Sequence, residues 1–256
     1  MKWPETLTLV RHDISAYNEF KKNKKDNPLY QRFLKAYEEN HLSKATRFFA
    51  EKVREELSIK VSDHNTPLAP GAGWQAEEMA KKLSTLIKLP DIIFVSPYRR
   101  TKDTFEHMKR GWPDLAKVEI KEEERMRERE HGLCLLYNDR KIFYVFHPEQ
   151  KLLEKLMGGY WYRFPQGENI PDVRARVSRF NDMLVREFVK RNVLVVTHHE
   201  TILAYRATME RMSANEYIDL DKKDKPINCG VTIYRGNPGL GRDGKLVLDI
   251  YNAKLY

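Results

Sequence analysis

Short apolar runs rich in β-branched residues, separated by longer stretches with helical periodicity, constrain the fold of this chain most strongly. The runs lie at residues 6–11, 91–96, 193–197, 231–235 and 246–251. The helical stretches lie at residues 74–87, 100–109, 172–190 and 200–209. This alternation is typical of an α/β protein with a mainly parallel or mixed sheet between helices. We therefore predict a three-layer α/β sandwich.

The segment from residue 29 to residue 57 interrupts this alternation. Its apolar residues, among them Phe33, Tyr37, Phe49 and Val53, form a broken helical stripe. This stripe predicts a helix pair, inserted at about residues 20–62. The basic run KKNKK at residues 21–25 is expected to be a solvated loop. Because no segment is typical of a linker, we expect a single domain over residues 1–256 that carries this helical insert.

Charge and apolar content restrict the partners of the protein. A formal net charge of +9 is compatible with nucleic acid, with an acidic membrane surface or with anionic small molecules, and charge alone does not choose among them. Nucleic acid is the weakest candidate, because most basic residues alternate with acidic ones along the helical segments. No apolar stretch approaches the roughly 20 residues that span a bilayer, and the N-terminus lacks the core of a signal peptide. We expect a cytoplasmic protein that binds neither nucleic acid nor membranes, and a homo-oligomer remains open.

Polar clusters follow three of the predicted strands, at the point where each strand ends. Arg11, His12 and Asp13 follow the first strand, SPYRR at residues 96–100 follows another, and THH at residues 197–199 follows a third. Ligands of open α/β sheets bind at the carboxyl ends of the strands. We therefore expect the three clusters to converge on one site.

Two histidines and two arginines in one crevice suit phosphoryl transfer. A neutral imidazole attacks phosphorus, and guanidinium groups match phosphate oxygens and stay charged. The reaction needs little beyond positioning and charge stabilisation, so enough cationic donors can replace a metal ion. The remaining histidines, among them His64, His107 and His147, lack ligand spacing. We predict no metal and no other cofactor.

These clusters resemble motifs of the histidine phosphatase superfamily, also called the phosphoglycerate-mutase-like family. LVRHDISAYN at residues 9–18 resembles L-V-R-H-G-x-S-x-x-N, PLAPGAGWQA at residues 67–76 resembles P-L-T-x-x-G-x-x-Q-A, and SPYRRTKDT at residues 96–104 resembles S-P-x-x-R-x-x-x-T. Further resemblances follow in family order: MREREHG at 126–132, GENIPDVRARV at 167–177, VVTHHETI at 195–202 and NCGVTIY at 228–234. The resemblance implies a phosphoglycerate-mutase-like fold.

The resemblance also implies roles for individual residues. His12 attacks the phosphorus, Glu128 donates a proton to the departing oxygen, and water then hydrolyses the phosphohistidine. The phosphoryl oxygens are held by Arg11, by Arg100 rather than Arg99, and by His198. Asn18 and Ser15 are expected as further substrate-binding residues, and His131 is expected to line the pocket. The neighbouring Glu123, Glu124 and Glu130 are expected to be solvated.

Two positions depart from the family pattern. The glycine after each catalytic histidine is replaced by Asp13 and His199. A carboxylate that faces the phosphate would repel it, unless Asp13 turns away or pairs with an arginine. We expect His199 to bind substrate as a cation or hydrogen-bond donor.

The segment YWYRFPQGEN at residues 160–169 is similar to a stretch of a phosphatase-like branch of the family, F-Y-R-F-P-N-G-E-S. It favours a metal-independent phosphomonoesterase that acts through a phosphohistidine on a small phosphorylated metabolite. Phosphoglycerate mutase is the alternative within the family. An impaired pseudoenzyme that only binds a phosphorylated ligand or a protein is the alternative of another class.

Overall fold

The computed structural model describes residues 2–256, which form two compact units. The first unit contains residues 2–15, His64–Glu128 and Asp172–Tyr256, and the second contains Ala16–Asp63 and Arg129–Pro171. The insert predicted at about residues 20–62 falls within the second unit. Residues 129–171 belong to the same unit, which was not predicted because the two segments lie far apart along the chain.

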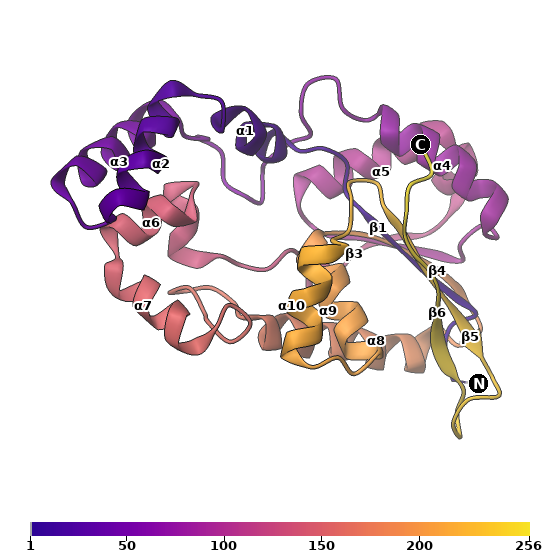
Figure 1. The fold of residues 1–256 in the computed structure, drawn as a ribbon. Helices are drawn as coiled ribbons and strands as arrows, with labels where there is room; N and C mark the ends of the chain where they lie inside the picture. Colours follow the sequence, from indigo (N-terminus) through magenta and orange to yellow (C-terminus); the bar gives the residue numbers. More distant parts are fainter. Residues whose placement is uncertain (1) are drawn as a thin grey trace. The chain divides into compact units, whose positions relative to one another are not determined.

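The first unit is built on one six-stranded sheet (Figure 1). Its strands are β1 (Thr6–Arg11), β2 (Ile92–Val95), β3 (Ile120–Glu122), β4 (Asn192–Thr197), β5 (Val231–Asn237) and β6 (Lys245–Ala253), in the order β3-β2-β4-β1-β5-β6. The first four are parallel to one another, β5 runs antiparallel to its neighbour β1, and β6 runs antiparallel to β5. The predicted mixed, mainly parallel sheet is confirmed. Strand β3 was not predicted, because its three residues are all exposed and carry no apolar pattern.

Helices cover both faces of this sheet (Figure 1). They are α4 (Trp74–Leu86), α5 (Arg99–Gly111), α8 (Ile170–Glu187), α9 (His199–Met209) and α10 (Ala214–Lys223). Successive side chains of a strand point to opposite faces. In β4, Val193 and Val195 therefore pack with α8 and α9, whereas Leu194 and Val196 pack with α4 and α5. The predicted three-layer arrangement is confirmed.

The second unit is helical. It contains α1 (Ala16–Lys24), α2 (Pro28–Asn40), α3 (Lys44–Glu56), α6 (Arg140–Phe146) and α7 (Pro148–Met157). Short 3-10 helices occur in the first unit at Pro113–Lys117 and Glu124–Met126, and in the second unit at Gly132–Tyr137. The side chains of Asn27 and Ser43 cap α2 and α3, and the predicted helix pair is confirmed. The solvated loop expected at residues 21–25 is wrong, because residues 21–24 end α1 and Lys24 is buried.

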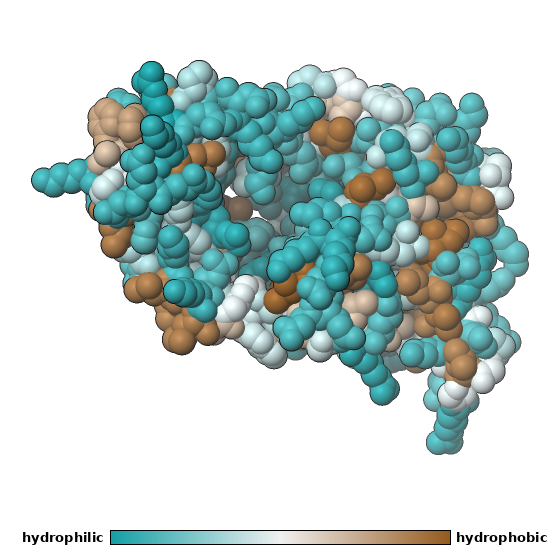
Figure 2. Space-filling model, viewed as in Figure 1, coloured by the Kyte–Doolittle hydropathy of each residue, from teal (hydrophilic) through white to brown (hydrophobic). Residues whose placement is uncertain are grey.

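Helix α7 exposes apolar side chains. None of its residues, all of which are described, is buried, and Leu152 and Leu156 are 67% and 82% exposed. Figure 2 shows hydrophobic residues gathered over this helix. Such a face is typical of an interaction surface, and the homo-oligomer stays a prediction. Within residues 2–256, every helix is too short or too polar to cross a membrane.

Candidate active site

The three polar clusters meet at the carboxyl edge of the parallel strands. Arg11 at the end of β1 pairs in register with Thr197 at the end of β4, and Val95 of β2 pairs with Val196. The next residues therefore emerge side by side. The hydroxyl of Ser96 lies 2.7 Å from Nε2 of His198, and the ring centroids of His12 and His198 are 5.2 Å apart. The predicted convergence is confirmed.

The backbone fixes the protonation state of His12. Its Nδ1 lies 2.6 Å from the carbonyl oxygen of Asp13. A carbonyl oxygen only accepts hydrogen bonds, so Nδ1 carries the proton and Nε2 keeps its lone pair. Burial, followed by the charges of Arg100 and Arg11, lowers the pKa of His12 well below its ordinary value. His12 is therefore a neutral imidazole whose Nε2 is nucleophilic.

His198 is fully buried beside His12. Burial, followed by the charge of Arg100, also lowers its pKa well below the ordinary value. Its Nε2 is bonded to Ser96, and its Nδ1 has no hydrogen-bond partner among the residues described. A buried polar atom of this kind is normally satisfied by a ligand or water. Nδ1 is thus available to an oxygen of a bound phosphoryl group.

Arg100 and Arg99 differ sharply in environment. Arg100 is 4% exposed in the first turn of α5, with its guanidinium 4.7 Å from the ring centroid of Tyr98. Arg99 is exposed and lies 3.6 Å from the carboxylate of Asp103. The ring of Tyr98 also packs against His198, at 5.0 Å between centroids. Tyr98 was not predicted as a site residue, because the family motif leaves its position unspecified.

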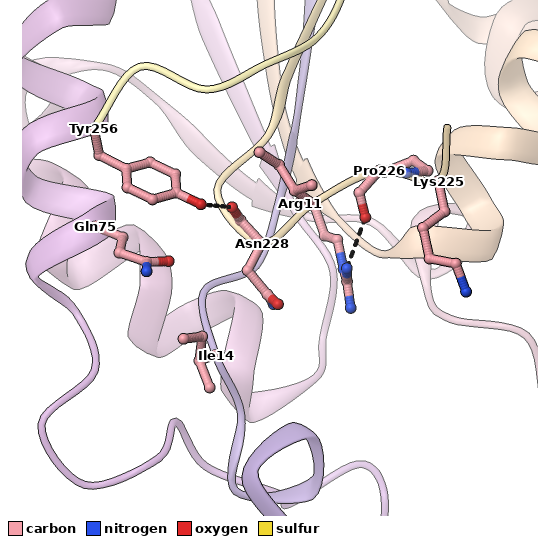
Figure 3. Close-up of a pocket in the computed structure, with 8 residues that line it drawn as sticks. Arg11, Ile14, Gln75, Lys225, Pro226, Asn228 and Tyr256 are labelled. Carbon is pink, nitrogen blue, oxygen red and sulfur yellow. Dashed lines mark hydrogen bonds between the residues drawn. The ribbon is translucent and has the colours of Figure 1, made fainter. Parts of the chain in front are cut away.

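Arg11 supports the loop that precedes β5 (Figure 3). Its Nη1 donates a hydrogen bond of 2.7 Å to the carbonyl oxygen of Pro226. Burial lowers the pKa of Arg11, and the charge of Glu128 partly offsets that effect. Guanidinium pKa values are so high that Arg11 stays charged at neutral pH.

The backbone around Glu128 is held by the rest of the first unit. The hydroxyl of Thr197 donates to the carbonyl of Met126, and that of Thr201 donates to the carbonyl of Arg127, each at 2.6 Å. Nη2 of Arg176 donates to the carbonyl of Glu128 at 3.2 Å. These bonds hold the backbone that carries Glu128, and the charge of the Glu128 carboxylate raises the pKa of Arg11.

The acidic neighbours of Glu128 are not all solvated. Glu124 is exposed, as expected. Glu123 is 6% exposed, and its Oε2 lies 2.6 Å from Nη2 of Arg125, so the expectation of a solvated side chain is wrong. The ion pair satisfies the buried carboxylate, which explains why Glu123 tolerates burial.

Asp13 directs its carboxylate to backbone amides, most of them at the start of α4. Oδ1 accepts a hydrogen bond of 2.7 Å from the amide of Ile14, and Oδ2 accepts bonds of 2.9 and 3.3 Å from the amides of Gly73 and Ala76. Gly73 is the N-cap of α4 and has no side chain to cap the helix. Asp13 therefore supplies this cap from a distant part of the chain. The helix dipole also stabilises the negative charge of its carboxylate at this N-terminus. Neither Asp13 nor His199 has a positive φ.

Asp13→Ala is expected to lower the free energy of unfolding by about 3 kcal/mol, because a helix cap and a buried charge-assisted hydrogen bond are both lost. Asp13→Gly, the family residue, should cost at least as much. Asp13→Asn keeps one acceptor oxygen and should lose less. Urea unfolding of the three variants measures this order. An Asp13→Ala variant as stable as the wild type would contradict the capping role.

His199 and Ser15 have partners within the first unit. His199 begins α9, and its Nε2 lies 2.8 Å from Oδ1 of Asp221, so one ring nitrogen is bonded to the protein. Ser15 is 2% exposed and forms an isolated β-bridge with Leu68. Their expected contacts with substrate stay predictions.

Asn18 and His131 belong to the second unit. Asn18 lies in α1, and the ring of His131 packs against Phe164 at 5.5 Å between centroids. Their expected roles in substrate binding stay predictions. Across residues 2–256, no group of three or more histidine, cysteine, aspartate or glutamate residues is arranged to hold a metal ion.

Comparison with known proteins decides the family. The model of the histidine phosphatase superfamily (branch 1) matches residues 52–242, which is more than half of the chain. The chain belongs to the histidine phosphatase superfamily. The matched residues of this chain include Arg100, Glu128 and His198, but not His12. The assignment of its nucleophile therefore depends on the motif at residues 9–18 and on the geometry above.

Two plant proteins that are similar in sequence to this chain are named phosphoglycerate mutase-like proteins. The chain is 24% identical over 212 residues to a phosphoglycerate mutase-like protein of Arabidopsis thaliana, covering 75% of this chain and 70% of that protein. A second such protein from the same plant is 30% identical over 145 residues, covering 54% of this chain and 44% of that protein. The chain thus matches less than half of the second relative.

Solved structures of phosphatases share its fold. A mycobacterial glucosyl-3-phosphoglycerate phosphatase in complex with inorganic phosphate gives a TM-score of 0.64 at 17% identity, with 98% of each chain covered. A phosphoserine phosphatase of Entamoeba histolytica in complex with 3-phosphoglyceric acid gives a TM-score of 0.62 at 18% identity, covering 97% of this chain and 96% of that one. At these identities the likeness shows the fold alone.

Proposed function

We propose that the protein is a phosphomonoesterase that hydrolyses a small phosphorylated metabolite through a phosphohistidine at His12, without a metal ion or other cofactor. The observation that carries the proposal is the hydrogen bond between Nδ1 of His12 and the carbonyl of Asp13, because it leaves Nε2 as a nucleophile. Membership of the histidine phosphatase superfamily supports the same chemistry.

The first step forms a bond between Nε2 of His12 and phosphorus, and breaks the bond between phosphorus and the ester oxygen. Arg11, Arg100 and His198 stabilise the charge on the transferred phosphoryl group, and Ser15 contributes a further donor. Glu128 gives its proton to the departing alkoxide. In the second step the Glu128 carboxylate takes a proton from water, whose oxygen attacks the phosphohistidine and releases phosphate.

A phosphoglycerate mutase would share the first step and then return the phosphoryl group to its substrate instead of to water. The names of the two plant relatives favour this alternative. The phosphatase-like stretch at residues 160–169 and the phosphatases among the structural neighbours favour hydrolysis. The two activities differ in the lifetime of the phosphoenzyme, which can be measured directly.

The test is incubation with a panel of ³²P-labelled phosphomonoesters, which includes p-nitrophenyl phosphate and 3-phosphoglycerate. We expect the protein to release inorganic phosphate with EDTA present. Quenching in alkali should trap a phosphoenzyme that is stable to base and labile to acid, as a phosphohistidine is. Rapid loss of the label to water supports the phosphatase, and slow loss with transfer between substrates supports the mutase. Absence of both label and turnover would favour the pseudoenzyme, and dependence on added metal would contradict the metal-independent mechanism.

A further inference from the structure

Helix α7 packs on its own unit through polar side chains. Oε1 of Gln150 accepts a hydrogen bond of 2.9 Å from the hydroxyl of Tyr162, and Oε2 of Glu154 accepts one of 2.6 Å from the hydroxyl of Tyr144. Nζ of Lys151 lies 4.8 Å from the centroid of an aromatic ring of α2. Residues 150, 151 and 154 share one face of a helix. This polar face therefore points toward the rest of the second unit.

The apolar side chains of α7 point the other way. Leu152 and Leu156 lie one helical turn apart and are the most exposed residues among them. Leu153 and Met157, which lie beside them, are 42% and 46% exposed, and Trp161 in the turn that follows the helix is 53% exposed. We call these five residues the α7 patch (Figure 2). A surface helix normally turns its apolar stripe to the core, so the orientation of α7 is inverted.

The inward contacts keep the α7 patch outside. Tyr144 and Tyr162 are 4% and 2% exposed, so their hydroxyls need the acceptors that α7 supplies. A rotation of α7 that buried its leucines would remove both acceptors and leave the two hydroxyls without partners, which is costly for a buried group. The patch is thus a fixed feature of the folded second unit.

The size of the α7 patch suits the apolar centre of a dimer interface. At about 150 to 200 Å² for each fully exposed side chain, the exposed fractions leave on the order of 500 Å² of apolar surface. A standard interface buries about 800 Å² on each partner, and a little more than half of that area is apolar. The patch alone would therefore supply the apolar part of one such interface.

The charges of α7 favour a second copy of the chain as the partner. The helix carries two glutamates and two lysines, whereas the whole chain has a formal net charge of +9. Two such basic copies repel each other, so a contact is most favourable where the local charge is balanced. In an antiparallel pair, Glu149 in the first turn of one helix approaches the last turn of the other, which carries Lys155. A helix that lies on a membrane surface would instead carry an excess of lysine and arginine.

We infer that the α7 patch is the contact between two copies of this chain, which are related by a two-fold axis with their α7 helices antiparallel. Such a contact uses the same surface on both copies. The inference does not rest on the proposed function, because none of the five patch residues belongs to the candidate active site.

Sedimentation velocity of the full chain at micromolar concentrations is expected to show a dimer. Leu156→Glu places a charge within the contact on both copies and should raise the dissociation constant of the dimer at least about a hundredfold. Leu240→Glu, at a 43% exposed leucine between β5 and β6, is the matched control and should leave the dimer unchanged. Because both leucines are exposed, both variants should keep the circular dichroism spectrum of the wild type.

Cross-linking tests the symmetry of the contact. A bifunctional maleimide should link Leu153→Cys to a second copy, because a two-fold contact places the patch opposite its own counterpart, and Leu240→Cys should stay unlinked. The two native cysteines are buried, so the wild type gives the background. A monomeric wild type, an undiminished dimer of Leu156→Glu or an unlinked Leu153→Cys would each overturn the inference. A monomer that sediments with phosphatidylserine vesicles would overturn it and assign the patch to a lipid surface.

Discussion

His12→Gln is expected to lower kcat for phosphomonoester hydrolysis by on the order of 10⁴-fold, because removal of a nucleophile leaves only binding and charge stabilisation. Glutamine can still donate to the carbonyl of Asp13, but it offers no imidazole lone pair at the position of Nε2. No phosphoenzyme should form in this variant. His41→Gln, at the C-cap of α2 in the second unit, is the matched control and should keep full activity. A His12→Gln variant that retains a tenth of the wild-type kcat would exclude His12 as the nucleophile.

The same variant tests the lowered pKa of His12 through the pH dependence of stability. Burial lowers the pKa of His12 in the folded protein below the ordinary histidine value of 6.5. The unfolded chain therefore binds more protons than the folded one below pH 6.5, and the unfolding free energy falls as the pH falls through that range. His198 adds to this effect in the same direction. Urea unfolding from pH 7 to pH 5 should show a shallower decline in His12→Gln than in the wild type.

Lys24→Met is expected to destabilise the second unit by about 3 to 5 kcal/mol, because it leaves a buried carboxylate without its cation. Nζ of Lys24 lies 2.6 Å from Oδ2 of Asp139, and the two side chains are only 4% and 10% exposed. The hydroxyl of Tyr30 donates to the same oxygen at 2.7 Å. Burial raises the pKa of Asp139, but the charge and hydrogen bond of Lys24, together with hydrogen bonds from Tyr30 and the amide of Ile142, hold the pKa below its ordinary value.

The controls separate the ion pair from a general effect of charge. Lys22→Met removes an exposed lysine of the same helix and should change stability little. Asp139→Asn breaks the pair from the other side, and the double variant Lys24→Met/Asp139→Asn should be more stable than the sum of the single losses predicts.

Hydrogen exchange of peptides from residues 16–63 and 129–171 locates the effect. Equal loss in the first unit would support the predicted single cooperative domain. No loss in either unit would contradict the role of the ion pair.

The sequence predicted the layers of the fold because buried strands and amphipathic helices leave strong patterns. Val193 to Val196 of β4 are all apolar, and α4 and α5 carry apolar residues at helical spacing. The pattern failed where burial depends on a specific partner. In the sequence, Lys24 is one lysine of a basic run. Only its contact with Asp139, more than a hundred positions away, explains why it is buried. A lysine in such a run carries no local sign of this pairing.

The same distinction holds within the candidate site. His12, Arg100 and His198 follow strands directly, so their meeting could be predicted from the order of the elements. The direction of the Asp13 carboxylate could not, because it depends on the bare amides at the start of α4, 60 residues further along the chain. The role of Tyr98 beside Arg100 and His198 likewise depends on side-chain packing that spacing does not encode.

The pairing of β1 has a consequence for the order in which the protein is made. Thr6 to Arg11 pair only with β4 and β5, which begin at residues 192 and 231. During synthesis, β1 therefore leaves the ribosome long before either neighbour exists, and its apolar edge stays unpaired meanwhile. Long-range pairing of this kind also slows folding. His12 thus acquires His198 and Asn228 only after most of the chain has been translated, so the candidate site forms late in synthesis.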